Sequence, residues 1–91
     1  FAVCDTLASG AISYLKEIGK SVPGDVSIIG FGDDSADMPN NLFLTTFRQN
    51  RDTIAELSAE ILLQVISKIP VPQVVRVPTE FIERKSVKKI N

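Results

Sequence analysis

Histidine is absent from this 91-residue sequence, and cysteine occurs only once, at Cys4. The absence of histidine excludes Ser-His-Asp and Cys-His catalytic arrangements and every histidine-based metal site. A lone cysteine excludes an internal disulfide and has no metal-ligand spacing. Because Cys4 follows an apolar run, we interpret it as a small buried hydrophobic residue. We therefore expect no enzyme activity, no metal site and no cofactor.

Excess charge of one sign and long apolar runs are also lacking. Ten basic and eleven acidic residues give a formal net charge of −1, so the chain has no electrostatic footprint for nucleic acid. No run approaches the roughly 18 apolar residues of a membrane span, and we expect no membrane association. The sequence starts at Phe1 inside an apolar run, without an initiator methionine or signal peptide, so we expect a piece of a longer protein.

The first third of the sequence alternates strand, helix and strand patterns. Phe1–Cys4 and Val26–Phe31 are short apolar runs, typical of buried parallel strands. Between them, apolar residues recur at helical spacing from Thr6 to Ile18, and Gly19 fits a helix stop. This order predicts an α/β fold in which βαβ units build a parallel sheet.

Asp5 directly follows the first predicted strand, at the strand end where open α/β sheets bind their ligands. Its carboxylate oxygens can accept hydrogen bonds from two neighbouring hydroxyl groups, which suits a sugar diol. One alternative is that Asp5 only caps its own helix. Another is a magnesium site formed with Asp33 and Asp34, as in a phosphoacceptor, although that acidic pair is more simply interpreted as a solvated loop.

A second helix is predicted from about Arg51 to Lys68, and the prolines that follow it would end it. Thr53 and Glu56 have the spacing of a capping box. Two other residues near the helix start could cap it instead, namely Asn50 and Asp52.

The remaining segments are predicted to be extended or irregular. Gly32–Asn41 is rich in glycine, proline, asparagine and aspartate and predicts an irregular loop. Leu44–Arg48 has a β-branched and aromatic bias and predicts a strand. Two later extended segments cover Val74–Val77 and Phe81–Arg84. The basic run from Arg84 carries no interleaved aromatics, and we interpret it as a solvated terminus. The tail from Lys85 is expected to fray.

Four motifs follow one another along the chain: Ser9-Gly10-Ala11 after Asp5, Val22–Phe31, Leu44-Thr45-Thr46 with Gln49, and Phe81–Ser86. Together they resemble the C-terminal part of the effector-binding domain of a LacI/GalR-type transcriptional regulator. The resemblance covers essentially the whole chain. It implies a partial periplasmic-binding-protein-like domain, in which two α/β lobes close on an effector.

By this resemblance, residues 1–36 and 74–91 belong to one lobe and residues 44–69 to part of the other. Hinge crossings would fall near 37–43 and 70–73. The resemblance implies effector contacts from both lobes, by Asp5, Gln49, Arg51 and Ile54. It also implies a dimer interface on the first helix, formed by Thr6, Leu7, Ser9, Gly10, Ser13 and Tyr14.

The resemblance implies the effector-sensing and dimerising part of a sugar-responsive, cytoplasmic repressor. The expected partners are a sugar or sugar phosphate, a second copy of the chain, and operator DNA bound through an N-terminal domain outside this sequence. Arg51 would favour a ligand with a phosphate or carboxylate, because guanidinium pairs bidentately with such groups. The alternative is a transport-associated sugar-binding protein of the same fold, which a signal peptide in place of a helix-turn-helix would reveal.

Overall fold

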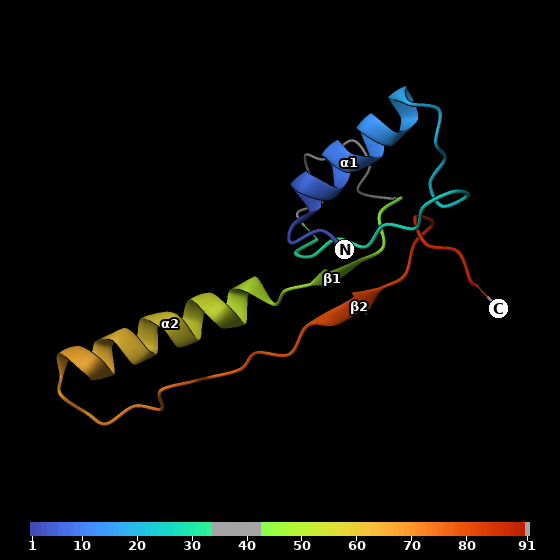
Figure 1. Cartoon of the computed structure of the whole chain (residues 1–91). Coiled ribbons are helices and arrows are strands. Elements are labelled where there is room, and N and C mark those ends of the chain that lie inside the picture. Colours follow the sequence, from blue (N-terminus) through green and yellow to red (C-terminus); the bar gives the residue numbers. More distant parts are fainter. Residues whose placement is uncertain (34–42, 91) are drawn as a thin grey trace. The chain divides into compact units, whose positions relative to one another are not determined.

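The computed structural model describes residues 1–33 and 43–90 (Figure 1). Its elements are α1 (Asp5–Glu17), β1 (Thr46–Arg48), α2 (Arg51–Ile66) and β2 (Glu80–Ile82). The chain divides into two compact units: unit 1 is Phe1–Arg48 with Glu80–Asn91, and unit 2 is Gln49–Thr79. Unit 1 therefore holds α1 and both strands, and unit 2 holds α2. Neither helix in the described part of the chain is long and apolar enough to cross a membrane.

Helix α1 confirms the first helix prediction, with boundaries shifted by one residue at each end. It ends in a Schellman motif, in which the Gly19 N–H bonds to the Lys16 carbonyl at 3.2 Å and the Lys20 N–H to the Leu15 carbonyl at 2.8 Å. Gly19 has a φ of +80°, which glycine adopts without a steric penalty. The predicted helix stop at Gly19 is thereby confirmed.

The core of unit 1 is small and partly polar. Its buried apolar side chains are Ala8, Ile28 and Leu44, with Ile12 and Leu15 of α1 packed against them among others. Three polar residues, Thr45, Thr46 and Ser86, are fully buried as well. Because buried polar groups need partners, their hydrogen bonds are part of what holds this unit together.

The parallel sheet predicted from the sequence is largely wrong for the described residues. Neither Phe1–Cys4 nor Val26–Phe31 forms a strand there. Parallel pairing is limited to two isolated bridges, Ile29 with Thr45 and Gly32 with Arg48. At the Ile29–Thr45 bridge, the Ser86 hydroxyl bonds both the Thr45 N–H and the Ile28 carbonyl, two groups that bond each other directly in a regular parallel ladder.

The only sheet among the described residues is the antiparallel pair of β1 and β2. Its register places Thr46 opposite Ile82, Phe47 opposite Phe81 and Arg48 opposite Glu80. The rings of Phe47 and Phe81 lie 5.2 Å apart between centroids, an aromatic cross-strand contact of the kind that stabilises such pairs.

Helix α2 is capped at its start by Asn50, whose Oδ1 accepts the Thr53 N–H at 3.1 Å. The capping box from Thr53 to Glu56 was therefore the wrong choice among the predicted caps, and the Asn50 alternative is confirmed. The helix ends at Ile66, two residues before the predicted end, in a second Schellman motif in which Lys68 has a φ of +57°.

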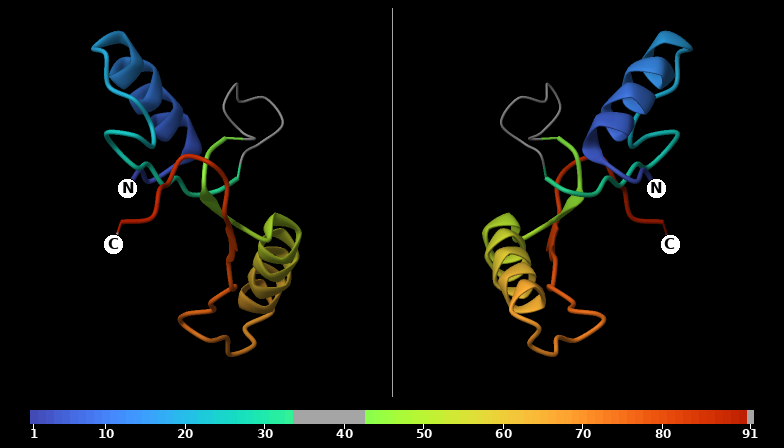
Figure 2. Two further views of the ribbon diagram at one scale, coloured as in Figure 1. Left: turned by 90° about the vertical axis from the view of Figure 1, so that its right-hand side faces the viewer. Right: turned by 90° about the vertical axis from the view of Figure 1, so that its left-hand side faces the viewer.

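Beyond α2 the chain returns alongside that helix in an extended path (Figure 1, Figure 2). Residues 74–77 join no ladder there, and pairing begins only at Glu80. The hinge crossing expected near 37–43 lies outside the described residues except for Phe43. The lobe boundaries implied by the resemblance, including the crossing near 70–73, stay predictions.

Candidate functional site

Asp5 lies in the first turn of α1 with only 4% of its surface exposed. Its Oδ1 accepts a hydrogen bond of 2.7 Å from the Thr46 hydroxyl of β1. Gly30 passes so close that a Cβ there would collide with the same oxygen. The N-cap position belongs to Cys4, which makes no side-chain cap bond. Asp5 therefore links the start of α1 to β1.

The other three residues expected to bind an effector belong to unit 2. Gln49 follows β1 directly and is half-buried, while Arg51 is the exposed first residue of α2. Ile54 lies three positions further along the helix, so that it and Arg51 are neighbours on one helix face. The structure thus brings Arg51 and Ile54 together, and a site that they share with Asp5 stays a prediction.

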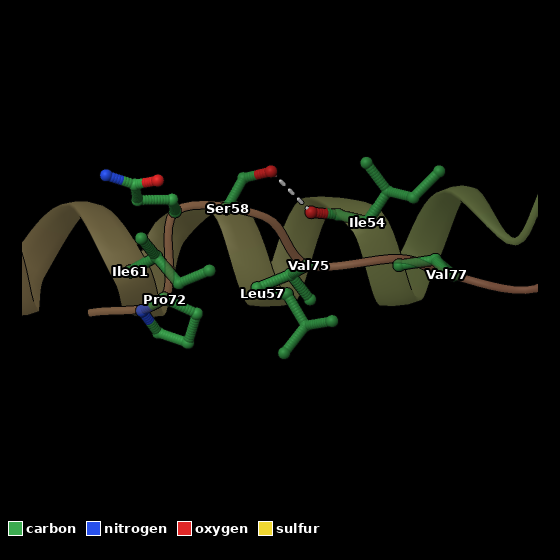
Figure 3. A pocket seen from close by; sticks show the side chains of 8 residues that line it. Ile54, Leu57, Ser58, Ile61, Pro72, Val75 and Val77 are labelled. Carbon is green, nitrogen blue, oxygen red and sulfur yellow. Dashed lines mark hydrogen bonds between the residues drawn. The ribbon is translucent and has the colours of Figure 1, made fainter.

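Unit 2 contains a groove between α2 and the returning segment, with a volume of about 470 Å³ (Figure 3). Its lining residues are Ile54, Leu57, Ser58, Ile61, Pro72, Gln73, Val75 and Val77. The Ser58 hydroxyl donates to the Ile54 carbonyl at 2.6 Å, so it is used within its own helix. The groove is of ligand size, but apolar walls dominate it, and it offers a polyhydroxylated ligand little to bond.

Asp33 forms an ion cluster with two arginines that lie 15 and 51 residues away in the sequence. Its Oδ2 lies 2.8 Å from Arg48 Nε, and its Oδ1 lies 2.8 Å from Arg84 Nη1. The side chain of Asp33 is only 3% exposed. The hydrogen bond from Arg84 lowers the pKa of Asp33 below its ordinary value of 3.8, and that from Arg48 adds to the effect against the opposing influence of burial.

This cluster replaces the magnesium site that Asp5, Asp33 and Asp34 suggested. Asp34 lies outside the described residues. Over residues 1–33 and 43–90, no group of three or more carboxylates or cysteines is placed to hold a metal ion. The assignment of Arg84 to a solvated terminus was wrong, since its guanidinium binds Asp33 and the Leu44 carbonyl. The sequence contained a signal for this cluster, because Asp33 closely follows one apolar segment and Arg48 and Arg84 end two others.

The helix face expected to form a dimer interface is largely exposed. Leu7 and Tyr14, both apolar in character, are 58% and 61% exposed. A Cβ added to Gly10 would meet nothing within 4 Å. Thr6 and Ser13 are exposed and Ser9 is half-buried, whereas Ala8 on the other face enters the core. Large apolar side chains left uncovered on one helix face are typical of an interaction surface.

Residues 1–87 match the model of a protein family described as the periplasmic binding protein-like domain. Among curated relatives, the chain is 36% identical to the transcriptional repressor PurR of Actinobacillus pleuropneumoniae over 100% of its own length and 28% of the relative's. It is 40% identical to the transcriptional regulator GalR of Salmonella typhimurium over 91% of its own length and 25% of the relative's. The chain thus spans about a quarter of the length of each relative.

Two solved structures are similar to the described fold. A lac repressor dimer bound to operator and the anti-inducer ONPF matches 94% of this chain and 31% of its own, with a TM-score of 0.78 and 28% identity. A LacI-family regulator from Enterococcus faecium with bound ribose matches 100% of this chain and 34% of its own, with a TM-score of 0.70 and 32% identity. The relatives are transcriptional regulators and not enzymes. The chain therefore belongs to the periplasmic-binding-protein-like domain family, as part of an effector domain of the LacI/GalR type.

Proposed function

We propose that this chain is the effector-sensing and dimerising part of a sugar-responsive, cytoplasmic LacI-type repressor. The similarity to the ribose-bound Enterococcus faecium regulator carries the proposal, because it extends over all of this chain in both sequence and fold. Operator DNA would be bound by an N-terminal domain outside this sequence, which agrees with a chain that carries almost no net charge.

The proposed effector contacts are Asp5 from unit 1 and Gln49, Arg51 and Ile54 from unit 2. A carboxylate that contacts sugar hydroxyls must be held in one orientation, and the bond from Thr46 provides that support for Asp5. Arg51 stands at the N-terminus of α2, where backbone N–H groups and the guanidinium would both favour a phosphate on the sugar. A sugar or sugar phosphate is thus the proposed ligand class.

Dimerisation is proposed through α1, by Thr6, Leu7, Ser9, Gly10, Ser13 and Tyr14. The exposed Leu7 and Tyr14 side chains would supply apolar contact area. Gly10 between them has no side chain and would allow the partner helix to approach closely. Effector binding would then shift the population between two lobe arrangements, and the dimer would transmit that shift to the DNA-binding domains.

Calorimetric titration of the intact full-length protein with ribose, ribose 5-phosphate and a panel of other mono- and disaccharides tests this proposal. We expect micromolar binding of at least one sugar, and a reduced affinity for sugar phosphates in Arg51→Gln. Arg76→Gln is the matched control, because Arg76 is an exposed arginine of the same unit outside the proposed site. Asp5→Asn should lose sugar affinity, whereas wild-type affinity in this variant would remove Asp5 from the site.

Three outcomes would contradict the assignment as a whole. Absence of binding across the panel would refute a sugar-responsive domain. Sugar binding by an intact protein that carries a signal peptide instead of a helix-turn-helix would support the transport-associated alternative. Retained binding to operator-like DNA that sugar does not alter would refute the effector-sensing role.

A further inference from the structure

The chain passes between the two units twice, after Arg48 and before Glu80. These two residues face each other in the register of the β1–β2 pair, and they are its last pair on that side (Figure 1). The ladder of unit 1 therefore stops where the chain leaves it and where it returns. If this strand pair stays closed, the backbone changes that let the units move must occur after Arg48 and before Glu80.

The Asp33 ion cluster includes the last residue of β1 and a residue just after β2. Asp33 binds Arg48, the last residue of β1, through one carboxylate oxygen, and Arg84, just after β2, through the other. Arg48 also lies 3.7 Å from Glu80 across the strand pair. A single buried carboxylate thus joins β1 and the segment after β2 to the stretch of chain around Gly32. All four charged residues belong to unit 1.

The surrounding backbone holds Asp33 in this position. The Gly32 N–H bonds to the Phe47 carbonyl at 2.7 Å, which ties the residue before Asp33 to β1. Asp33 itself has a φ of +56°, a conformation that a residue other than glycine adopts at some energetic cost. The backbone of Arg84 is held in turn, because its backbone N–H donates to the Thr45 hydroxyl at 2.9 Å. The cluster is therefore fixed through its backbone as well as its charges.

We infer that Asp33 is a positioning residue that clamps both crossing strands to unit 1 and confines movement between the units to residues 49–50 and 78–79. Removing the Asp33 carboxylate is costly, because Asp33 and Arg84 have side chains that are only 3% and 16% exposed, and the loss leaves the Arg84 charge without compensation in a poorly solvated place. The clamp would therefore keep the strand pair closed while the units move. Hinges of this kind concentrate backbone change in a few residues at the ends of elements.

The clamp would also shape the response to an effector, and this part of the inference rests on the proposed function. A joint confined to two short links allows fewer lobe arrangements than a joint that includes both strands. Releasing the clamp would add arrangements that cannot bind effector, and the apparent affinity falls with the fraction of protein that is competent to bind. The expected result of releasing the clamp is weaker effector binding without any change in the contacts to the effector.

Hydrogen exchange of the intact, ligand-free protein, read by mass spectrometry, tests the clamp directly. In Asp33→Asn we expect exchange to rise about tenfold in residues 44–48 and 80–84, with α1 unchanged. Asp25→Asn is the matched control, since Asp25 is another unit 1 carboxylate whose pKa is lowered, by hydrogen bonds from Ser21. Asp33→Glu, which keeps the charge, should restore most of the protection.

Several results would overturn the inference. A uniform rise across α1 as well as the strands would show that Asp33 supports only overall stability. Unchanged strand exchange in Asp33→Asn, or a rise confined to residues 70–73, would place the joint elsewhere. If Asp33→Asn does not fold, Arg48→Gln serves instead, because Arg48 is half-exposed, and it should loosen residues 46–48 to a smaller degree.

A second readout separates this inference from the proposed function. With ribose as the probe, Asp33→Asn should weaken binding about fivefold relative to wild type, whereas Asp25→Asn should not. If the wild-type protein binds no ribose, the result counts against the proposed response to this sugar and not against the clamp. The hydrogen-exchange experiment still tests the clamp in that case. If wild type binds ribose and Asp33→Asn exchanges faster but binds equally well, the clamp has no influence on the effector response.

Discussion

Replacing Ser86 with alanine removes a hydroxyl that joins two segments far apart in the sequence. Ser86 is fully buried, as is Thr45 beside it. Its Oγ donates to the Ile28 carbonyl at 2.6 Å and accepts the Thr45 N–H at 2.8 Å. The Ser86 carbonyl also accepts the Ile28 N–H at 2.9 Å, a bond that the substitution leaves intact. Ser86→Ala therefore deletes two hydrogen bonds while keeping the backbone position of residue 86.

The expected cost follows from the two groups left behind. Each buried polar group that loses its only partner costs about 1–3 kcal/mol, because it gives up solvation without compensation. For the Thr45 N–H and the Ile28 carbonyl together, we expect Ser86→Ala to lower the free energy of unfolding by about 2–6 kcal/mol. That corresponds to a roughly 30- to 20,000-fold change in the unfolding equilibrium, at about 1.4 kcal/mol for each factor of ten.

Urea unfolding of the intact protein measures this loss as a lower midpoint at constant slope. Ser27→Ala is the matched control, because the Ser27 hydroxyl accepts a single exposed bond of 3.1 Å from the Lys88 N–H. We expect the control to cost less than about 0.5 kcal/mol. A similarly small loss in Ser86→Ala would refute the reasoning. It would show that the two segments move together without the hydroxyl, so that the Thr45 N–H and the Ile28 carbonyl bond each other directly.

Three further changes test other parts of the structure. Lys68→Gly should raise the free energy of unfolding by about 0.5–1 kcal/mol in urea titrations, because Lys68 has a φ of +57° that glycine adopts freely; no gain would contradict this. Gly10→Arg should dissociate the proposed dimer in analytical ultracentrifugation, because the large side chain would occupy the space that glycine leaves for the partner helix; a dimer unaffected by arginine would argue for another interface. The pKa of Asp33 is lowered in the folded state, so its ionised form stabilises the fold. The difference in free energy of unfolding between wild type and Asp33→Asn, measured by urea titration, should be constant above about pH 5 and should shrink as the pH falls below 3.8. A difference that grows toward acid would show that the pKa of Asp33 is raised on folding, not lowered.

The helices show how much local sequence can predict. Both lie where apolar residues recur with helical period, and their boundaries differ from the predictions by no more than two residues. Gly19 ends α1 as expected, since a glycine after the last apolar position is a local signal. Lys68 does the same for α2 without any such signal, and the predicted helix accordingly ran two residues too far.

Strands and charge pairs were predicted less well, because their partners are distant in the sequence. The run Val26–Phe31 is as apolar as a central strand requires, but its pairing is reduced to isolated bridges. Asp33 looked like part of a loop or a metal site, and only the fold brings Arg48 and Arg84 to it, 15 and 51 residues away. For Asp5, the sequence identified a functional candidate, and the structure added its bond to Thr46, 41 residues further on.

The sequence alone therefore determined the two helices, one helix stop and the family, all of which depend on the order and spacing of near neighbours. An α-helix bonds each N–H to a carbonyl four residues earlier, so its signal lies within one short window. The tertiary structure alone decided the strand register, the buried role of Ser86 and the arginines that bind Asp33. These depend on which segments meet after the chain has folded, and no short window of sequence contains both partners.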